Sequence, residues 1–275
     1  MPTAIARSRE TRRIPPRLIR LGAWRRGFYA RRVRLLCVSD IHGHADALAA
    51  VLATAERRGY NHLLVAGDLC FPGPRPLETW QRLQQVKAIC AQGASDRALA
   101  TLDLAQVRPR SEHERERIER VSQIRAELGD LILIRLARLP PIHRMPLPNG
   151  QELILVHGSP ADPLEPLTHD MTDQELLTLI GDDPADVVVC GGSHVPFDRT
   201  VSGVRIINVG SVGEAPSSVG PDDADPSEAA PPRIRHADAA FIELRDGRVE
   251  VETLTVPLGR PGAAALVAKT LAPRD

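Results

Sequence analysis

The chain has 275 residues, of which 43% are hydrophobic and 25% charged, and these values exclude fibrous, collagen-like and disulfide-scaffold classes. The length fits one α/β domain with short appendages. The formal net charge is zero. No apolar run reaches the roughly 18 residues that a membrane-spanning helix needs, so we expect no membrane span.

The positive charge is concentrated at the N-terminus. Residues 1–34 contain eleven arginines and a single acid, Glu10, whereas the rest of the chain has an excess of acids. We interpret residues 1–32 as an Arg-rich arm without a buried face. A solvated, disordered tail is the simpler interpretation, and an anchor for nucleic acid or another anionic surface is the alternative.

Four cysteines stand at positions 37, 70, 90 and 190, too far apart for a C-x-x-C metal or redox motif. We expect them to be buried as small hydrophobic side chains in a reducing compartment. No apolar stretch follows the Arg-rich start, so no secretory signal is predicted, and a transit peptide is the minor alternative. The expected location is therefore cytoplasmic.

The first half of the chain alternates predicted strands and helices. Apolar, β-rich runs predict strands over 33–39, 62–66 and 86–91. Helical patterns cover 45–58, 77–85, 96–105 and 111–128. The last of these helices is densely charged, with opposite charges three or four residues apart, which is typical of a helix that faces solvent.

The second half is rich in predicted hairpins. These pair 142–147 with 152–156, 199–201 with 204–209, and 239–244 with 248–256. A helix over 172–181 and a strand over 186–190 lie between the first two hairpins. Residues 214–236 are predicted to form a mobile loop, and a short helix over 260–271 falls in a tail at 257–275. The order of these elements over residues 33–256 therefore predicts mixed sheets that pack face to face, with helices on the outside.

Polar residues follow the predicted strands at five points, and ligands in α/β folds bind at the carboxyl ends of strands. Asp40 and His42 are two residues apart, so in extended backbone they point to the same side, and this pair suits a divalent metal. A lone histidine after a strand is more often a hydrogen-bonded loop residue than a ligand. Five such clusters, one after another along the chain, are harder to explain in that way. The first contains Asp40 and His42, and the next four contain Asp68, Asp96, His157 and His194 in turn.

These motifs, in this order, resemble those of the calcineurin-like metallophosphoesterases, in particular their small bacterial phosphodiesterase-like branch. The matching pieces are D-I-H at 40–42, G-D at 67–68, G-A-S-D at 93–96, H-G at 157–158, G-G-S-H at 191–194 and N-V-G-S-V-G at 208–213. The resemblance covers about residues 33–256. It implies an α/β fold, a four-layer α/β/β/α sandwich of two mixed β-sheets with helices on both outer faces.

The resemblance further implies two neighbouring metal sites. The first would be held by Asp40, His42, Asp68 and His194. The second would be held by Asp68, His157 and two further ligands, at positions that are Ala94 and Gly192 in this chain. Neither of these side chains can ligate a metal. We therefore expect one tightly bound divalent ion (Mn, Fe, Zn or Ni) and a weak or absent second one.

Catalytic roles are implied for Asp68, His157 and Asp96. For Asp96, a structural role that orients a neighbouring group is at least as well supported. Ser95 stands where many relatives have a histidine that protonates the leaving group, and serine is a poor general acid at neutral pH.

Three functions remain open. The first is a metal-dependent phosphoesterase that hydrolyses small phosphodiesters with a metal-bound hydroxide. The second is a catalytically impaired protein that binds a metal or phosphate ligand in a regulatory role, as Ala94 and Gly192 suggest. The third is nucleic-acid binding through the Arg-rich arm, although aromatic residues make up only 3% of the chain and base-stacking platforms are scarce. The sequence defines neither the substrate nor the oligomeric state.

Overall fold

The structure is a computed structural model that describes residues 33–216 and 236–258. The predictions for the Arg-rich arm at 1–32, for the tail helix at 260–271 and for most of the loop at 214–236 fall outside these ranges. The hairpins and strands that were predicted from the alternating pattern lie almost entirely inside them.

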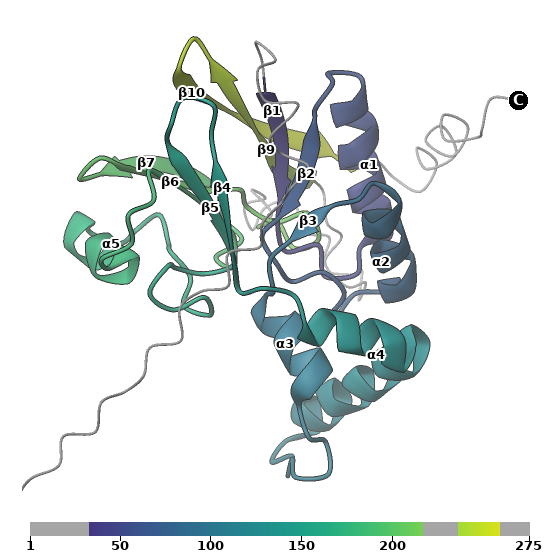
Figure 1. The fold of residues 1–275 in the computed structure, drawn as a ribbon. Coiled ribbons are helices and arrows are strands. Elements are labelled where there is room, and N and C mark those ends of the chain that lie inside the picture. Colours follow the sequence, from purple (N-terminus) through teal and green to yellow (C-terminus); the bar gives the residue numbers. More distant parts are fainter. Residues whose placement is uncertain (1–32, 217–235, 259–275) are drawn as a thin grey trace, which may run out of the picture. The chain divides into compact units, whose positions relative to one another are not determined.

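The described strands form two five-stranded mixed sheets (Figure 1). In the first sheet, with the order β10-β9-β1-β2-β3, strands β1, β2 and β3 run parallel. Its strands are β1 (Val33–Val38), β2 (His62–Val65), β3 (Ile89–Cys90), β9 (His236–Arg245) and β10 (Arg248–Pro257). In the second sheet, with the order β4-β5-β6-β8-β7, strands β5, β6 and β8 run parallel. Its strands are β4 (Ile142–Pro146), β5 (Glu152–Val156), β6 (Val187–Cys190), β7 (Phe197–Val201) and β8 (Val204–Asn208).

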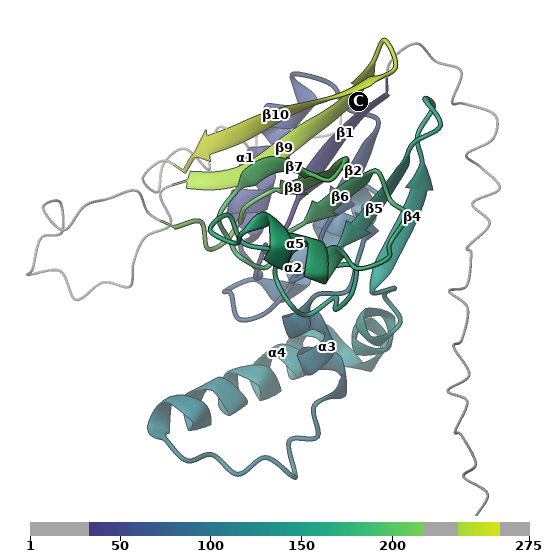
Figure 2. The ribbon, with the colours of Figure 1, turned by 90° about the vertical axis from the view of Figure 1, so that its left-hand side faces the viewer.

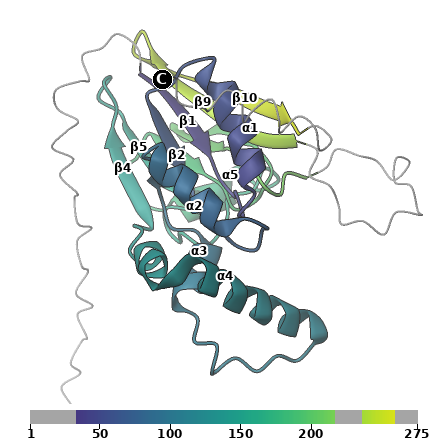
Figure 3. The same cartoon turned by 90° about the vertical axis from the view of Figure 1, so that its right-hand side faces the viewer.

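Helices cover the outer face of each sheet (Figures 2 and 3). Helices α1 (Ala45–Glu56) and α2 (Pro76–Gln85) lie on the first sheet. Leu48 and Leu36 belong to the hydrophobic core under α1. Helix α5 (Asp173–Ile180) lies on the second sheet, where Leu176 packs in a separate core with Val188. The predicted four-layer α/β/β/α sandwich of two mixed sheets is thereby confirmed.

Two further helices lie together at one end of the sheets (Figures 2 and 3). Helix α3 (Ala94–Thr101) and helix α4 (Glu112–Ala137) share a core that contains Leu99, Ile124 and Leu128. Helix α4 is interrupted at Gly129, whose φ of 73° no helix accommodates. In the described ranges, no helix is both long and apolar enough to cross a membrane.

Three predicted elements differ from the structure. The strand predicted over 86–91 is reduced to Ile89–Cys90, because Lys87 has a φ of 54° and belongs to a turn after α2. Helix α3 begins at Ala94 rather than at residue 96, and ends at Thr101 rather than at residue 105. Helix α4 continues to Ala137 rather than ending at residue 128, because the segment beyond Gly129 packs Leu136 into the core. The four cysteines are free and buried, as expected.

Candidate metal centre

The predicted site residues meet where the parallel strands of both sheets end. Asp40 and His42 follow β1, Asp68 follows β2, His157 follows β5 and His194 follows β6. Backbone hydrogen bonds join these loops directly. The amide of Asp40 donates to the Gly67 carbonyl at 3.1 Å, and the amide of His42 donates to the Asp68 carbonyl at 2.9 Å. The two-sheet topology therefore brings together residues that are more than 150 positions apart.

Four of these residues have left-handed backbone. The φ angles are 52° at Asp40, 50° at His42, 55° at Asp68 and 63° at His194. Such conformations cost about 1–3 kcal/mol each for residues other than glycine, and they persist only where surrounding contacts impose them. Their concentration at one point of the molecule supports a functional origin for the strain.

Asp40, His42 and His194 form the first ligand group, with ligand atoms that all lie within 4.8 Å of one another. The Nε2 atoms of the two histidines are 3.2 Å apart. They lie 3.7 Å (His42) and 3.3 Å (His194) from Oδ1 of Asp40. That oxygen is buried without a hydrogen-bond partner in the described part of the chain, while Oδ2 accepts from the Gly192 amide at 2.9 Å. An unpartnered buried carboxylate oxygen beside two imidazoles fits a divalent cation.

The two buried histidines of the centre are oriented by backbone carbonyls. Nδ1 of His42 lies 2.5 Å from the Phe71 carbonyl, and Nδ1 of His157 lies 2.8 Å from the Ala66 carbonyl. Because a carbonyl only accepts, each Nδ1 carries the proton and donates it. The lone pair of each neutral ring is then on Nε2, the atom that faces the carboxylates.

Asp40, Asp68 and His157 form the second ligand group, again with ligand atoms within 4.8 Å of one another. All three side chains are buried. Nε2 of His157 lies 3.6 Å from Oδ2 of Asp68. The carboxylate of Asp40 thus belongs to both groups, whereas Asp68 groups only with the second. The resemblance places Asp68 in both metal sites and Asp40 in the first alone, and this assignment stays a prediction.

Ala94 and Gly192 border the second group. A Cβ atom at Gly192 would lie 3.4 Å from Nε2 of His157, so a side chain at this position would begin beside that ligand. Ala94 is exposed and lines the same pocket as Asp68. Two positions beside this group therefore contribute no ligand atom from a side chain.

Asp96 is fully buried, and both of its carboxylate oxygens accept backbone hydrogen bonds. Oδ2 accepts from the amides of Asp68 at 2.9 Å and Gly93 at 3.0 Å, and Oδ1 accepts from the amide of Leu69 at 2.9 Å. Burial, together with the nearby charge of Asp68, raises the pKa of Asp96 to about 6. This geometry supports the structural interpretation, in which Asp96 holds the loop that carries Asp68.

The buried charged groups of the centre shift one another's pKa values. Burial alone would raise the pKa of Asp40, but the surrounding histidines, with His194 foremost, outweigh it and lower that pKa. Burial would likewise lower the pKa of His157, but the charges of Asp68 and Asp40 outweigh it and raise that pKa. The neighbouring carboxylate of Asp40 also raises the pKa of His194. The acids and histidines thus stabilise each other's charged forms.

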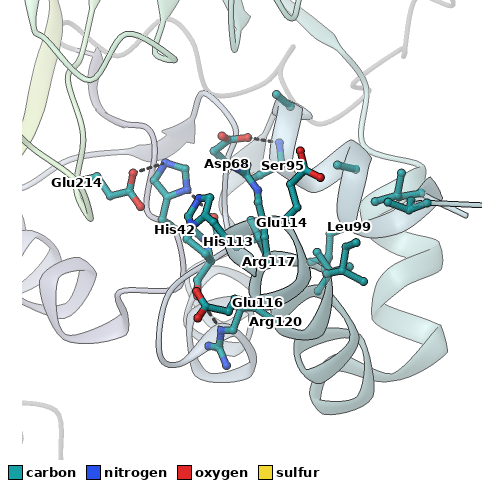
Figure 4. Close-up of a pocket in the computed structure, with 18 residues that line it drawn as sticks. His42, Asp68, Ser95, Leu99, His113, Glu114, Glu116, Arg117, Arg120 and Glu214 are labelled. Atoms are coloured by element: carbon teal, nitrogen blue, oxygen red, sulfur yellow. Dashed lines mark hydrogen bonds and ion pairs between the residues drawn. The ribbon is translucent and has the colours of Figure 1, made fainter. Parts of the chain in front are cut away.

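Glu214 is a neighbour of the centre that sequence reasoning missed. Its Oε2 atom lies 3.7 Å from Nε2 of His42 (Figure 4). The same atom lies 3.8 Å from Nδ1 of His194. The Glu214 amide donates to the Ser211 hydroxyl at 2.7 Å, and that hydroxyl donates to the Asp40 carbonyl at 2.9 Å. The sequence placed Glu214 at the start of a mobile loop, although its position directly after N-V-G-S-V-G was the available signal.

A pocket of about 750 Å³ opens beside the centre (Figure 4). His42, Asp68 and Glu214 line it on the side of the centre, and α3, the 102–111 connection and α4 line the rest. The charged helix predicted over 111–128 exposes most of its residues to solvent, as expected. In addition, half-buried Ile118 and buried Val121 of α4 form part of the pocket wall, which the sequence did not indicate.

Comparisons with known proteins agree with this geometry. Residues 33–222 match the model of the calcineurin-like phosphoesterase superfamily domain. A hypothetical protein from Pyrococcus horikoshii OT3 has a similar structure with a TM-score of 0.65 and 17% identity, over 87% of this chain and 92% of that one. A metallophosphoesterase from Sphaerobacter thermophilus gives a TM-score of 0.60 and 23% identity, over 86% and 94%. None of the curated proteins compared with the chain matches it. With a family match over most of its length, the chain belongs to the calcineurin-like phosphoesterase superfamily.

Proposed function

We propose that this protein is a divalent-metal-dependent phosphoesterase that hydrolyses small phosphodiesters. The observation that carries the proposal is the first ligand group, in which the buried, unpartnered Oδ1 of Asp40 lies next to Nε2 of His42 and of His194. A carboxylate oxygen and two imidazole nitrogens are a donor set for Mn, Fe, Zn or Ni. Family membership and the pocket beside the centre add independent support.

A bound divalent ion would supply Lewis acidity, which activates water and stabilises charge on phosphoryl oxygens. The chain's own residues prepare the site for it. The Phe71 and Ala66 carbonyls fix the rings of His42 and His157 with Nε2 directed inward. The carboxylates balance the cation's charge in a buried setting. Ser95 lines the pocket, and its amide donates to Oδ1 of Asp68 at 2.8 Å.

We assign the tighter site to the first group, with Asp68 close by, and the weaker site to Asp68 and His157 together with Asp40. His157 and Asp68 then hold a weakly bound second ion or orient the phosphate. Asp96 acts as a positioning residue for Asp68 through its three backbone hydrogen bonds. The pocket volume of about 750 Å³ supports a diester, because it has room for organic substituents beyond the phosphate.

Hydrolysis of bis(4-nitrophenyl) phosphate with and without Mn²⁺ tests the proposal. We expect turnover that requires the ion, that EDTA abolishes and that His42→Ala loses. His169→Ala is the matched control, because this exposed histidine lies outside the centre and should retain activity. Activity that survives chelation, or that His42→Ala retains, would contradict the proposal.

A catalytically impaired, ligand-binding protein is the second candidate, and the bare positions Ala94 and Gly192 beside the second group favour it. It predicts that Mn²⁺ binds without turnover, and that Ala94→Asn combined with Gly192→His creates activity. Because Gly192 has a φ of 74°, the histidine carries a backbone cost of about 1–2 kcal/mol, so the double variant should first be checked for folding. Brisk turnover by the unaltered protein excludes this candidate.

A further inference from the structure

We propose that the substrate is a phosphate ester of an apolar organic group, and that this group binds against α3 and α4 while its phosphate lies at the metal centre. The inference rests on the proposed function and specifies its substrate class. It is carried by the size, lining and charge of the pocket that His42, Asp68 and Glu214 border.

The pocket is larger than a phosphate requires. Its volume of about 750 Å³ falls within the range of sites that bind whole organic ligands of about 300–1,000 Å³. The centre occupies only one side of this space (Figure 4). The remaining volume extends along α3 and α4, so it has room for the rest of a substrate molecule.

Helix α3 lines the pocket with a stripe of apolar side chains. Ala94, Ala98 and Leu102, of which the last directly follows the helix, are spaced four residues apart and all line the pocket. The two alanines are exposed, and Leu102 is a large apolar side chain that is 38% exposed. The small residues leave room next to Asp68, and the leucine offers apolar surface farther along. When an apolar ligand group covers exposed apolar surface in a pocket, binding becomes more favourable, because that surface is removed from water.

The other wall contributes further apolar side chains and is held in place by specific contacts. Phe71, Val107, Ile118 and Val121 line it. Arg125 of α4 donates to the carbonyls of Leu99 and Leu102 at 2.7 Å each, and Arg120 donates to the carbonyls of Pro72 at 2.9 Å and of Gly73. These hydrogen bonds fix α4 against α3 and against the loop after β2. The apolar space is therefore formed before a ligand arrives, which reduces the ordering cost of binding.

The charges around the pocket argue against a polyanionic substrate. Glu114, Glu116 and Glu214 line it, and they oppose the positive charges of Arg117 and Arg120. Arg120 is already engaged with backbone carbonyls. A nucleic acid or polyphosphate would place further phosphates beside these carboxylates, where like charges repel. A single phosphate at the centre with an uncharged, apolar remainder avoids this repulsion.

Phosphonates provide a direct test, because their carbon–phosphorus bond replaces the hydrolysable ester bond. We would titrate phenylphosphonate, methylphosphonate and inorganic phosphate calorimetrically into the Mn²⁺-loaded protein. Burial of the phenyl ring should make phenylphosphonate bind about tenfold or more tightly than methylphosphonate. Equal affinity of the two phosphonates would overturn the inference while leaving the proposed function intact. Failure of all three compounds to bind would also overturn the inference, whereas the turnover of bis(4-nitrophenyl) phosphate decides the proposed function separately.

A pair of leucine variants tests where the apolar group of the ligand binds. Leu102→Gln should weaken phenylphosphonate several-fold and leave methylphosphonate unchanged. Leu131→Gln is the control, because Leu131 is 66% exposed on α4 and does not line the pocket. The same loss in both variants, or in neither, would overturn the assignment to this wall. Phenylphosphonate that binds equally well without Mn²⁺ would indicate adventitious apolar binding and overturn it too.

Discussion

The two ligand groups of the metal centre share Asp40 but differ in what surrounds them. The first adds His42 and His194, and Glu214 lies within 3.8 Å of a nitrogen of each histidine. The second adds Asp68 and His157, and next to it stand two positions whose side chains offer no donor atom, Ala94 and Gly192. The two groups thus share one carboxylate but differ in the donor side chains that lie beside it.

The backbone of the second group is tightly built. Gly93 approaches so closely that a Cβ atom there would lie 2.1 Å from Oδ1 of Asp68, and Asp96 fixes the Asp68 loop. The contrast between the two groups therefore lies in the side chains around them. Metal affinity, measured group by group, tests whether this contrast makes the two groups unequal.

Replacement of the shared carboxylate should have the largest effect. Asp40→Asn leaves an oxygen for the Gly192 amide but removes the negative charge from both groups. Residues that hydrogen-bond to metal ligands contribute about 10–100-fold to metal affinity, and a ligand itself should contribute more. We therefore expect Mn²⁺ binding to weaken more than about 100-fold in calorimetric titrations. Asp130→Asn, at an exposed position of α4, is the control. An Asp40→Asn protein that binds Mn²⁺ normally would rule out the shared carboxylate as a ligand.

The two histidine truncations should then separate the groups. His194→Ala removes a ligand from the first group, and His157→Ala removes one from the second. We expect a loss of about 100-fold in Mn²⁺ affinity for His194→Ala and of about tenfold or less for His157→Ala. Titration combined with elemental analysis of the bound metal measures both. The reverse order would mean that the second group holds the tighter ion.

Asp96→Asn tests the framework beneath the second group. The amide keeps one acceptor oxygen and replaces the other with a donor that faces backbone N–H groups. With buried donors left unsatisfied, we expect a loss of about 2 kcal/mol in the free energy of unfolding, or about 4–8 °C in Tm. Differential scanning calorimetry of the metal-free protein checks this. An unchanged Tm would show that the three hydrogen bonds are dispensable for the fold.

Acid should weaken metal binding gradually. In the metal-free protein, the carboxylates raise the pKa of His157 and His194 above the usual 6.5, so both begin to take up protons above that pH. A proton and a metal ion compete for the same nitrogen, and affinity falls as pH is lowered. We expect Mn²⁺ affinity to fall between pH 8 and 6, by up to about tenfold per pH unit for each proton displaced. Affinity that is constant over this range would exclude histidine ligation.

Several features of this molecule were readable from the sequence because they follow from local patterns. Alternation and turn residues predicted the three hairpins, and the resemblance of the polar motifs to a known family implied that Asp40, His42, Asp68 and His194 would lie together. Strand β3 was overestimated, because a turn at Lys87 takes part of its apolar run. The extension of α4 beyond Gly129 depends on tertiary packing of Leu136, which no local pattern shows.

The remainder of the site depends on distances between segments that sequence spacing does not define. Glu214 reaches the histidines because its loop is bound to the Asp40 backbone through Ser211. The charged face of α4 predicted solvent exposure correctly, but the pattern gave no sign that its few apolar residues, such as Ile118, form a wall of the pocket. The grouping of Asp40 with His157 likewise required coordinates.

One short segment, residues 71–73, contacts both the metal centre and the pocket wall. Its Phe71 carbonyl orients the ring of His42, and Arg120 of α4 holds the next two carbonyls. The guanidinium of Arg117 also lies over the Phe71 ring, 5.7 Å from its centroid. Residues 71–73 thus connect a histidine of the candidate metal centre to the helix that lines the pocket. If metal and ligand binding are coupled through this segment, thermodynamic linkage requires each to change the affinity of the other by the same factor.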